Sequence, residues 1–187
     1  MDIVEFFAQS AGKWSSLRTS HHPALKQQEG GKSDLQIDLL EKNDPAVIQL
    51  CELYKIDSTT ALCGVQIAWN GTLEPKQQKR SGSTVLVAIA NPENPKVGRL
   101  LRKVGPATEQ VPGTGRYEMG SGDELTLIIE DNTMYSRERI WFESPNVRLR
   151  HNILKQSDGF GMASFCSEVR MGGAKPPTPT SDAATNS

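Results

Sequence analysis

Hydrophobic and polar residues alternate with a period of two in many segments of the chain, and the clearest case lies between residues 136 and 153. Two strand-like segments there flank the tripeptide Ser-Pro-Asn at 144–146. Proline fixes φ and asparagine tolerates the left-handed region, so this tripeptide suits a tight turn. After it, Val147, Leu149 and Ile153 fall on one face of an extended chain and polar residues on the other. The segment therefore predicts a β-hairpin.

The register of this hairpin decides which side chains meet. A three-residue loop at 144–146 pairs Glu143 with Val147 and puts the even-numbered residues of both strands on one face. That face then carries one carboxylate, one amide and two guanidinium groups, namely Glu138, Asn152, Arg148 and Arg150. A four-residue loop would instead place Glu138 opposite His151 and break the arrangement. The sequence leaves both registers open.

This charged face has a functional and a structural interpretation. Two arginines on one strand offer planar forks that suit paired carboxylates or phosphates. Glu138 could accept N–H bonds or supply a proton. Ile140 and Phe142 lie between the charges, which suits a large, partly apolar anion as ligand. The alternative is an outward charged face with a few cross-strand ion pairs, which contribute little to stability.

Two helices are expected in the first third of the chain. Asp2 is suited to cap a short helix that ends by Gly12. Asp44-Pro45 is a good start for a second helix, with aspartate as the cap and proline at the first position. Its apolar residues recur at helical spacing, which indicates a core-facing stripe of Val47, Leu50, Cys51 and Tyr54.

Most of the remaining chain is predicted as strands. Besides the hairpin, strands are expected at 14–22, 34–40, 62–69, 83–90, 97–104, 114–119, 124–130 and 162–170. Turns are expected at Gly30-Gly31 and Asn70-Gly71, followed by a polar loop that runs to about Gly82. The segment 83–90 is apolar on both faces, so both faces should be covered. Trp14 and Trp141 are interpreted as core residues.

About ten strands in series, with few helices, favour a mainly β barrel or sandwich. Sequential hairpins favour an up-and-down antiparallel barrel, which closes its edges and can enclose one ligand. Residues 1–170 are expected to form this single domain. Residues 171–187 are rich in Gly, Pro, Thr, Ser and Ala without periodicity, which predicts a disordered tail.

Charge and cysteine content narrow the function classes. The 187 residues carry a net charge of −1, so bulk charge suggests no nucleic-acid or membrane partner. The N-terminus has neither the charged region nor the apolar run of a signal peptide. The three cysteines lack CxxC spacing, and the neighbours His21 and His22 have no further ligands close in sequence, so no disulfide and no metal site are expected. A reducing cytosol is the simplest setting.

Two separated motifs resemble a known family, the S/U-type phycobiliprotein bilin lyases. The first consists of Phe-Phe at 6–7, Ser-Ala-Gly-Lys-Trp at 10–14 and Arg-Thr-Ser-His-His at 18–22. The second consists of Glu-Arg-Ile-Trp-Phe at 138–142, Ser-Pro-Asn at 144–146 and Arg-Leu-Arg at 148–150. The resemblance covers about residues 1–170. It implies a lipocalin-like, fatty-acid-binding-protein-like barrel of about ten strands with a helix.

The resemblance also implies an activity and a site. Lyases of this family bind a free linear tetrapyrrole and join it by a thioether bond at ring A to a cysteine of a phycobiliprotein subunit. The residues that match the family's bilin pocket are Trp69, Glu138, Arg148 and Arg150, with Asn152, Arg18 and His21 as further candidates. Arg148 and Arg150 would hold the two propionates, and Trp69 would stack on a pyrrole ring.

Three of these residues are expected to act in catalysis, namely Glu138, Arg148 and His21. Glu138 would accept the pyrrole N–H groups and hold a proton on the bilin, which makes ring A more electrophilic. Arg18 and His21 cannot share a face of a regular strand, so either a bulge intervenes or only one of them reaches the pocket. Asn152 stands where some relatives have serine, which bears on the choice of bilin.

The two-histidine motif resembles members that attach phycocyanobilin to phycocyanin β or allophycocyanin subunits. The expected substrate is therefore phycocyanobilin, with no further cofactor, in the cytosol of a cyanobacterium or the stroma of a plastid. A homodimer or a heterodimer with a related subunit is left open. Two other functions remain: a non-catalytic bilin chaperone or lyase subunit, and an unrelated fatty-acid carrier that uses internal arginines for one carboxylate.

Overall fold

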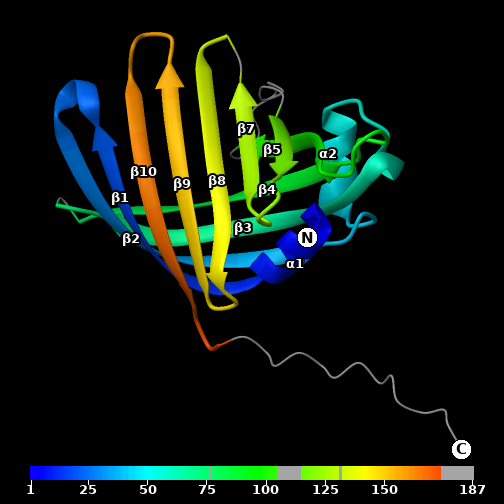
Figure 1. Cartoon of the computed structure of the whole chain (residues 1–187), viewed down its shortest axis with the longest axis horizontal. Coiled ribbons are helices and arrows are strands. Elements are labelled where there is room, and N and C mark those ends of the chain that lie inside the picture. Colours follow the sequence, from blue (N-terminus) through cyan, green and yellow to red (C-terminus); the bar gives the residue numbers. More distant parts are fainter. Residues whose placement is uncertain (76, 105–114, 131, 174–187) are drawn as a thin grey trace, which may run out of the picture.

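The structure, a computed structural model, describes residues 1–75, 77–104, 115–130 and 132–173. Two helices and ten strands lie in this part of the chain (Figure 1). They are α1 (Ile3–Ser10), β1 (Gly12–His22), β2 (Gln27–Leu40), α2 (Pro45–Leu53), β3 (Ala61–Leu73), β4 (Gln78–Ile89), β5 (Val97–Val104), β6 (Gly115–Met119), β7 (Leu125–Glu130), β8 (Met134–Ser144), β9 (Val147–Gln156) and β10 (Gly161–Arg170). Short 3-10 turns lie at Pro23–Leu25 and Ser58–Thr60.

The strands close into one antiparallel barrel. Each strand pairs with its neighbours in the sequence, and β1 pairs with β10 to complete the ring. The predicted up-and-down barrel is therefore confirmed. Because β1 and β10 meet, residues near the two ends of the chain share one wall of the interior.

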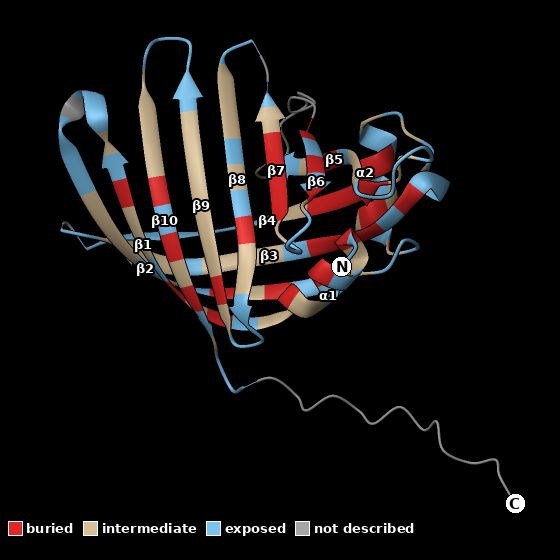
Figure 2. Cartoon of the chain, viewed as in Figure 1, coloured by how far each residue is buried: buried red, intermediate tan, exposed pale blue. Residues whose placement is uncertain are grey.

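Helix α1 fills part of the barrel interior with apolar side chains. Asp2 caps it: its carboxylate accepts a hydrogen bond from the backbone N–H of Glu5 at 2.8 Å, and the Glu5 carboxylate accepts one from the N–H of Asp2 at 2.9 Å. Ile3, Phe6 and Phe7 are buried in the main core together with side chains of the strands (Figure 2). The predicted capped helix is confirmed.

Helix α2 covers the outside of the barrel and explains why one strand is apolar on both faces. In β4, Leu86 and Ala88 face the main core, whereas Val87 and Ile89 join a second core. The helix supplies to this second core the stripe expected from the sequence, Val47, Leu50 and Cys51. Burial on both faces of β4 thus follows from the barrel on one side and α2 on the other (Figure 2).

The two glycine turns expected from the sequence do not form. Strand β2 starts at Gln27 and runs through both glycines, because the chain reverses earlier, at the 3-10 turn that ends at Lys26 with φ of 50°. Strand β3 likewise runs through Asn70-Gly71. A Cβ at Gly71 would lie 2.5 Å from the Cβ of Ser33, so this glycine allows two strands to approach closely.

Two further expectations are wrong in whole or in part, and a third concerns residues that lie mostly outside the described ranges. The polar loop to Gly82 is wrong in part, because β4 already begins at Gln78; Lys76 lies outside the described residues. Trp14 is a core residue, but Trp141 lies on the outer face beside Phe165. The reason is that the even-numbered residues of β8 face inward. The predicted tail falls mostly on 174–187, outside the described residues.

Candidate functional site

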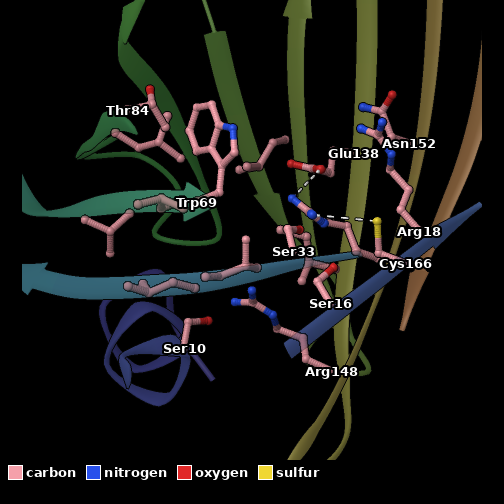
Figure 3. A pocket seen from close by; sticks show the side chains of 18 of the residues that line it. Ser10, Ser16, Arg18, Ser33, Trp69, Thr84, Glu138, Arg148, Asn152 and Cys166 are labelled. Carbon is pink, nitrogen blue, oxygen red and sulfur yellow. Dashed lines mark hydrogen bonds and ion pairs between the residues drawn. The ribbon is translucent and has the colours of Figure 1, made fainter. Parts of the chain in front are cut away.

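The barrel encloses a cavity of about 630 Å³, which lies in the size range of small-molecule sites. Apolar side chains of α1, β2, β3, β4, β5 and β7 line much of it. Polar and charged side chains of β1, β8, β9 and β10 gather on one side and include Arg18, Glu138, Arg148, Asn152 and Cys166 (Figure 3), together with Arg150. Lys32 of β2, Arg80 of β4 and Arg102 of β5 also line the cavity. The cavity therefore has an apolar wall and a charged wall.

The register of the β8–β9 hairpin brings the charged residues together. Glu138 is opposite Asn152, Ile140 opposite Arg150 and Phe142 opposite Arg148. This is the register expected for a three-residue loop, but it arises in a different way.

The turn of this hairpin is tighter than expected. Ser144, rather than Glu143, pairs with Val147, and the register shifts between Phe142 and Ser144. Glu143 is thus the extra residue of a β-bulge. A two-residue turn plus one bulged residue shifts the strands by the same amount as a three-residue loop, so the inward faces coincide.

The same rows of paired residues continue across the barrel wall into β10 and β1. Arg150 is opposite Cys166, and Cys166 is opposite Arg18. In the next row Arg148 is opposite Glu168, which is opposite Ser16. The β9–β10 pairing thereby adds Glu168 to the two arginines of the hairpin, and closure of the barrel between β10 and β1 adds Arg18.

Glu168 is the main site residue that sequence reasoning missed. It is fully buried, and its Oε2 lies 2.7 Å from both Nε and Nη2 of Arg148. Its Oε1 lies 3.1 Å from Nη2 of Arg150 and accepts a hydrogen bond from Ser16 Oγ at 3.3 Å. The available signal was its even-numbered position in the last strand, two residues after Cys166.

Glu138 completes a row of alternating charges. Its Oε1 lies 3.3 Å from Nη1 of Arg150, so Arg150 bridges the two carboxylates. Arg148, Glu168, Arg150 and Glu138 together carry no net charge. We call these four residues the charge tetrad.

The pKa values of the charge tetrad reflect burial and pairing. Burial lowers the pKa of Arg148 from its ordinary value. For Arg150 burial acts in the same direction, but the carboxylates of Glu138 and Glu168 outweigh it and raise the pKa. Burial alone would raise the pKa of Glu168, yet Arg150 and Arg148 hold it below its usual range. Glu168 therefore stays ionised at neutral pH.

Arg18 differs from the other two arginines of the charged wall. It lines the cavity and is partly buried, and among the described residues its guanidinium group has no hydrogen bond and no ion pair. Arg148 is only 5% exposed and is already paired with Glu168. Among the three arginines of the charged wall, Arg18 is therefore the one whose charge is most available to an entering anion.

The first histidine of the Arg18–His22 motif does not reach the cavity. Strand β1 pairs with β2 and β10 without a bulge, so Arg18 faces inward and His21 outward, where it is exposed. His22 faces the same way as Arg18, with Nε2 at 3.6 Å from Glu29 and its ring 5.5 Å from that of Phe160. A catalytic role of His21 inside the cavity is thus not compatible with its face of the strand.

Trp69 and Asn152 lie on different walls. Trp69 comes from β3, half a barrel away from the β8–β9 hairpin, and lines the cavity while packing on the main core. Asn152 lies on the charged wall, where its Nδ2 donates a hydrogen bond to Ser136 Oγ at 3.2 Å. A flat ligand between these walls would meet an indole on one side and charges on the other.

Among the described residues, no group of three His, Cys, Asp or Glu side chains is placed to hold a metal ion. Within the same ranges no helix combines the length and apolar character needed to cross a membrane.

The barrel and its cavity have the form of a protein that binds a small molecule in its interior. The model of the CpeS-like protein family matches residues 2–171, and the chain belongs to this family. A chromophore lyase CpcS/CpeS of Thermosynechococcus vestitus is 56% identical over 176 residues, which cover 94% of this chain and 96% of the relative. The phycocyanobilin lyase subunit CpcS of Picosynechococcus sp. is 39% identical over 187 residues, which cover 99% and 93%.

A solved structure agrees with these relatives. The S-type phycobiliprotein lyase CPES of Guillardia theta has a TM-score of 0.82 and 31% sequence identity to this chain. The likeness covers 93% of this chain and 95% of that protein. The family resemblance and the lipocalin-like barrel expected from the sequence are therefore confirmed.

Proposed function

We propose that this protein binds phycocyanobilin in the barrel cavity and attaches it to a cysteine of a phycocyanin β or allophycocyanin subunit. The family and the relatives show that the chain is a lyase that attaches a bilin chromophore to a phycobiliprotein. The choice of phycocyanobilin is supported by the relative in Picosynechococcus, which is a phycocyanobilin lyase subunit. The bilin is the substrate, and we propose no further cofactor.

The observation that carries the proposal is the division of the cavity into two walls. A linear tetrapyrrole is large and mostly apolar, and it has two propionates and a row of pyrrole N–H groups. The apolar wall with Trp69 suits the ring system, and the charged wall supplies both cations and a carboxylate. A fatty acid would need one cation and would leave Glu138 without a function.

The arginines have different roles in this proposal. Arg148 and Arg150 were both expected to hold propionates, but each already pairs with a carboxylate. We assign one propionate to Arg18, which forms no ion pair with a carboxylate among the described residues. We assign the other to Arg150, whose side chain is 27% exposed. Arg148 supports this wall through its contacts with Glu168 and with the ring of Trp14, whose centroid lies 5.0 Å away.

Glu138 is placed to act on the pyrrole nitrogens. It faces the cavity, and its second oxygen has no hydrogen bond or ion pair to another described residue. A carboxylate there accepts N–H bonds and favours the protonated bilin, which withdraws electrons from ring A. The acceptor thiol then adds across the ethylidene double bond: the C–S bond forms, the π bond breaks, and the thiol proton is transferred to the ring carbon.

The thiols inside the barrel are poor competitors for the bilin. Burial raises the pKa of Cys63 to about 12 and also raises the pKa of Cys166. The thiolate is the nucleophilic form, so both residues stay largely unreactive at neutral pH. This supports a protein that releases its bilin to an acceptor rather than keeping it.

Reconstitution tests the proposal. The protein is mixed with phycocyanobilin and apo-phycocyanin β subunit, and the products are separated on a denaturing gel and detected by zinc fluorescence. We expect a fluorescent acceptor band that requires this protein and is lost when the acceptor cysteine is replaced. No band with either acceptor subunit, despite intact protein and bilin, would contradict the proposed reaction.

A second candidate is favoured by one observation. The Picosynechococcus relative is named a lyase subunit, which suggests that some members act with a partner. In that case the protein alone would give a red-shifted bilin spectrum without attachment, and addition of a related subunit would restore the fluorescent band.

A further inference from the structure

Strand β4 passes directly behind the indole of Trp69. In the register of β3 and β4, Trp69 is opposite Gly82. A Cβ built on Gly82 would lie 2.5 Å from Cζ2, 2.9 Å from Cε2 and 3.1 Å from Cη2 of the indole. The three nearest atoms all belong to the six-membered ring of Trp69. The indole therefore rests on the bare backbone of β4.

The backbone itself does not require glycine at this position. Gly82 lies inside β4 and is not among the glycines with positive φ. Any residue can adopt an extended conformation, and most form strands better than glycine does. The sequence Ser-Gly-Ser at 81–83 is thus not a turn, and what distinguishes position 82 is the space that a side chain would take from Trp69.

We propose that Gly82 is a positioning residue that sets the place of the Trp69 indole in the cavity and thereby the space left for a pyrrole ring. The inference rests on the proposed bilin binding. A methyl group at position 82 would lie closer to the indole ring than the van der Waals radii of two carbon atoms allow. Because β4 closes one side, the ring must move away from this strand, toward the cavity, or leave its rotamer. Either change alters the surface on which the bilin stacks.

The test is a double-mutant cycle with Gly82→Ala and Trp69→Phe. Phenylalanine keeps an aromatic face but is too short to reach the position of the outer indole ring, so it removes the contact with position 82. We expect Gly82→Ala to weaken phycocyanobilin binding about tenfold with Trp69 present and less than about twofold with Phe at 69. Kd is measured by fluorescence quenching, together with the absorption and circular dichroism of the bound bilin.

A matched control is Gly161→Ala in β10. The nearest atom to a Cβ there is the Leu154 carbonyl oxygen at 3.9 Å, so this change adds a methyl group to a strand without a clash. We expect no change in Kd or in the bound spectrum. Equal losses for Gly82→Ala in both Trp69 backgrounds would overturn the inference, because the effect would then come from the backbone of β4. An unchanged Kd with Trp69 present would overturn it as well.

Failure of the proposed function gives a different result. In that case the wild-type protein itself shows no phycocyanobilin binding. The near-ultraviolet circular dichroism of the ligand-free proteins then decides the role of Gly82. A change on Gly82→Ala that is absent in the Trp69→Phe background supports the positioning of the indole, and no change contradicts it.

Discussion

Replacement of Glu168 by glutamine tests the charge tetrad most directly. The change keeps the shape of the side chain and removes one negative charge. Arg148 would then be left 5% exposed without its ionic partner, and Arg150 would keep only Glu138. Removing one member of a buried ion pair costs about 3–5 kcal/mol, because a buried charge stays uncompensated.

The expected loss can be measured by thermal unfolding. For a protein of this size about 1 kcal/mol corresponds to roughly 2–4 °C in Tm, so Glu168→Gln should lower Tm by roughly 6–20 °C. The charge-balanced double variant Arg148→Gln with Glu168→Gln should lose less than the single variant, because no unpaired charge remains. A surface control is Glu118→Gln, since Glu118 pairs with Arg116 at 3.3 Å and both are about half exposed. That change should cost below about 1 kcal/mol.

Two results would refute the reasoning. The first is a Glu168→Gln variant no less stable than Glu118→Gln, which would mean that Arg148 finds water or another partner. The second is a double variant at least as unstable as the single one, which would assign the loss to packing rather than to charge.

Three further predictions concern the ligand and pH. Arg18→Gln should weaken phycocyanobilin binding about tenfold or more, since a hydrogen bond to a charged group is worth about 1.5–3 kcal/mol, and should leave Tm unchanged. Binding is measured by titration calorimetry, with Arg99→Gln, at an exposed arginine, as the control. Equal affinity of both variants would show that Arg18 does not contact the bilin. Glu138→Gln should still bind bilin but reduce the red shift of its absorption and the rate of transfer in the gel assay, and a wild-type spectrum and rate would contradict the acid role. Because the pKa of Glu168 is lowered in the fold, its contribution to stability is present above the ordinary carboxyl pKa of about 4.3 and is lost as pH falls through the lower folded value. In urea unfolding below pH 4.3, the wild type should therefore lose stability more steeply than Glu168→Gln.

Much of the fold could be predicted from local pattern. The helix caps Asp2 and Asp44, the strand at 97–104 and the apolar segment 83–90 all have the structures expected of them. Caps, alternation and turn chemistry depend on a few neighbouring residues, so they can be recognised along the chain. The turns predicted at Gly30-Gly31 and Asn70-Gly71 were wrong, because both pairs lie inside strands; Gly71 serves the close approach of β2 and β3 instead of a turn.

The sequence by itself determined which side chains of a strand share a face, and only the tertiary structure decided which strands bring those faces together. The even-numbered positions of residues 138, 148, 150 and 152 were recognisable, but the bulge at Glu143 set their register. Glu168 joined them through the pairing of β10 with β9, and Arg18 through the pairing of β1 with β10 that closes the barrel. This closure brings together Ser16 and Glu168, which are 152 residues apart in the sequence. The period of a strand is a local property, whereas the closure of a barrel depends on the twist and packing of all its strands. Local alternation therefore connects Glu138, Arg148 and Arg150 of the charge tetrad, and the pairing of β10 with β9 adds Glu168.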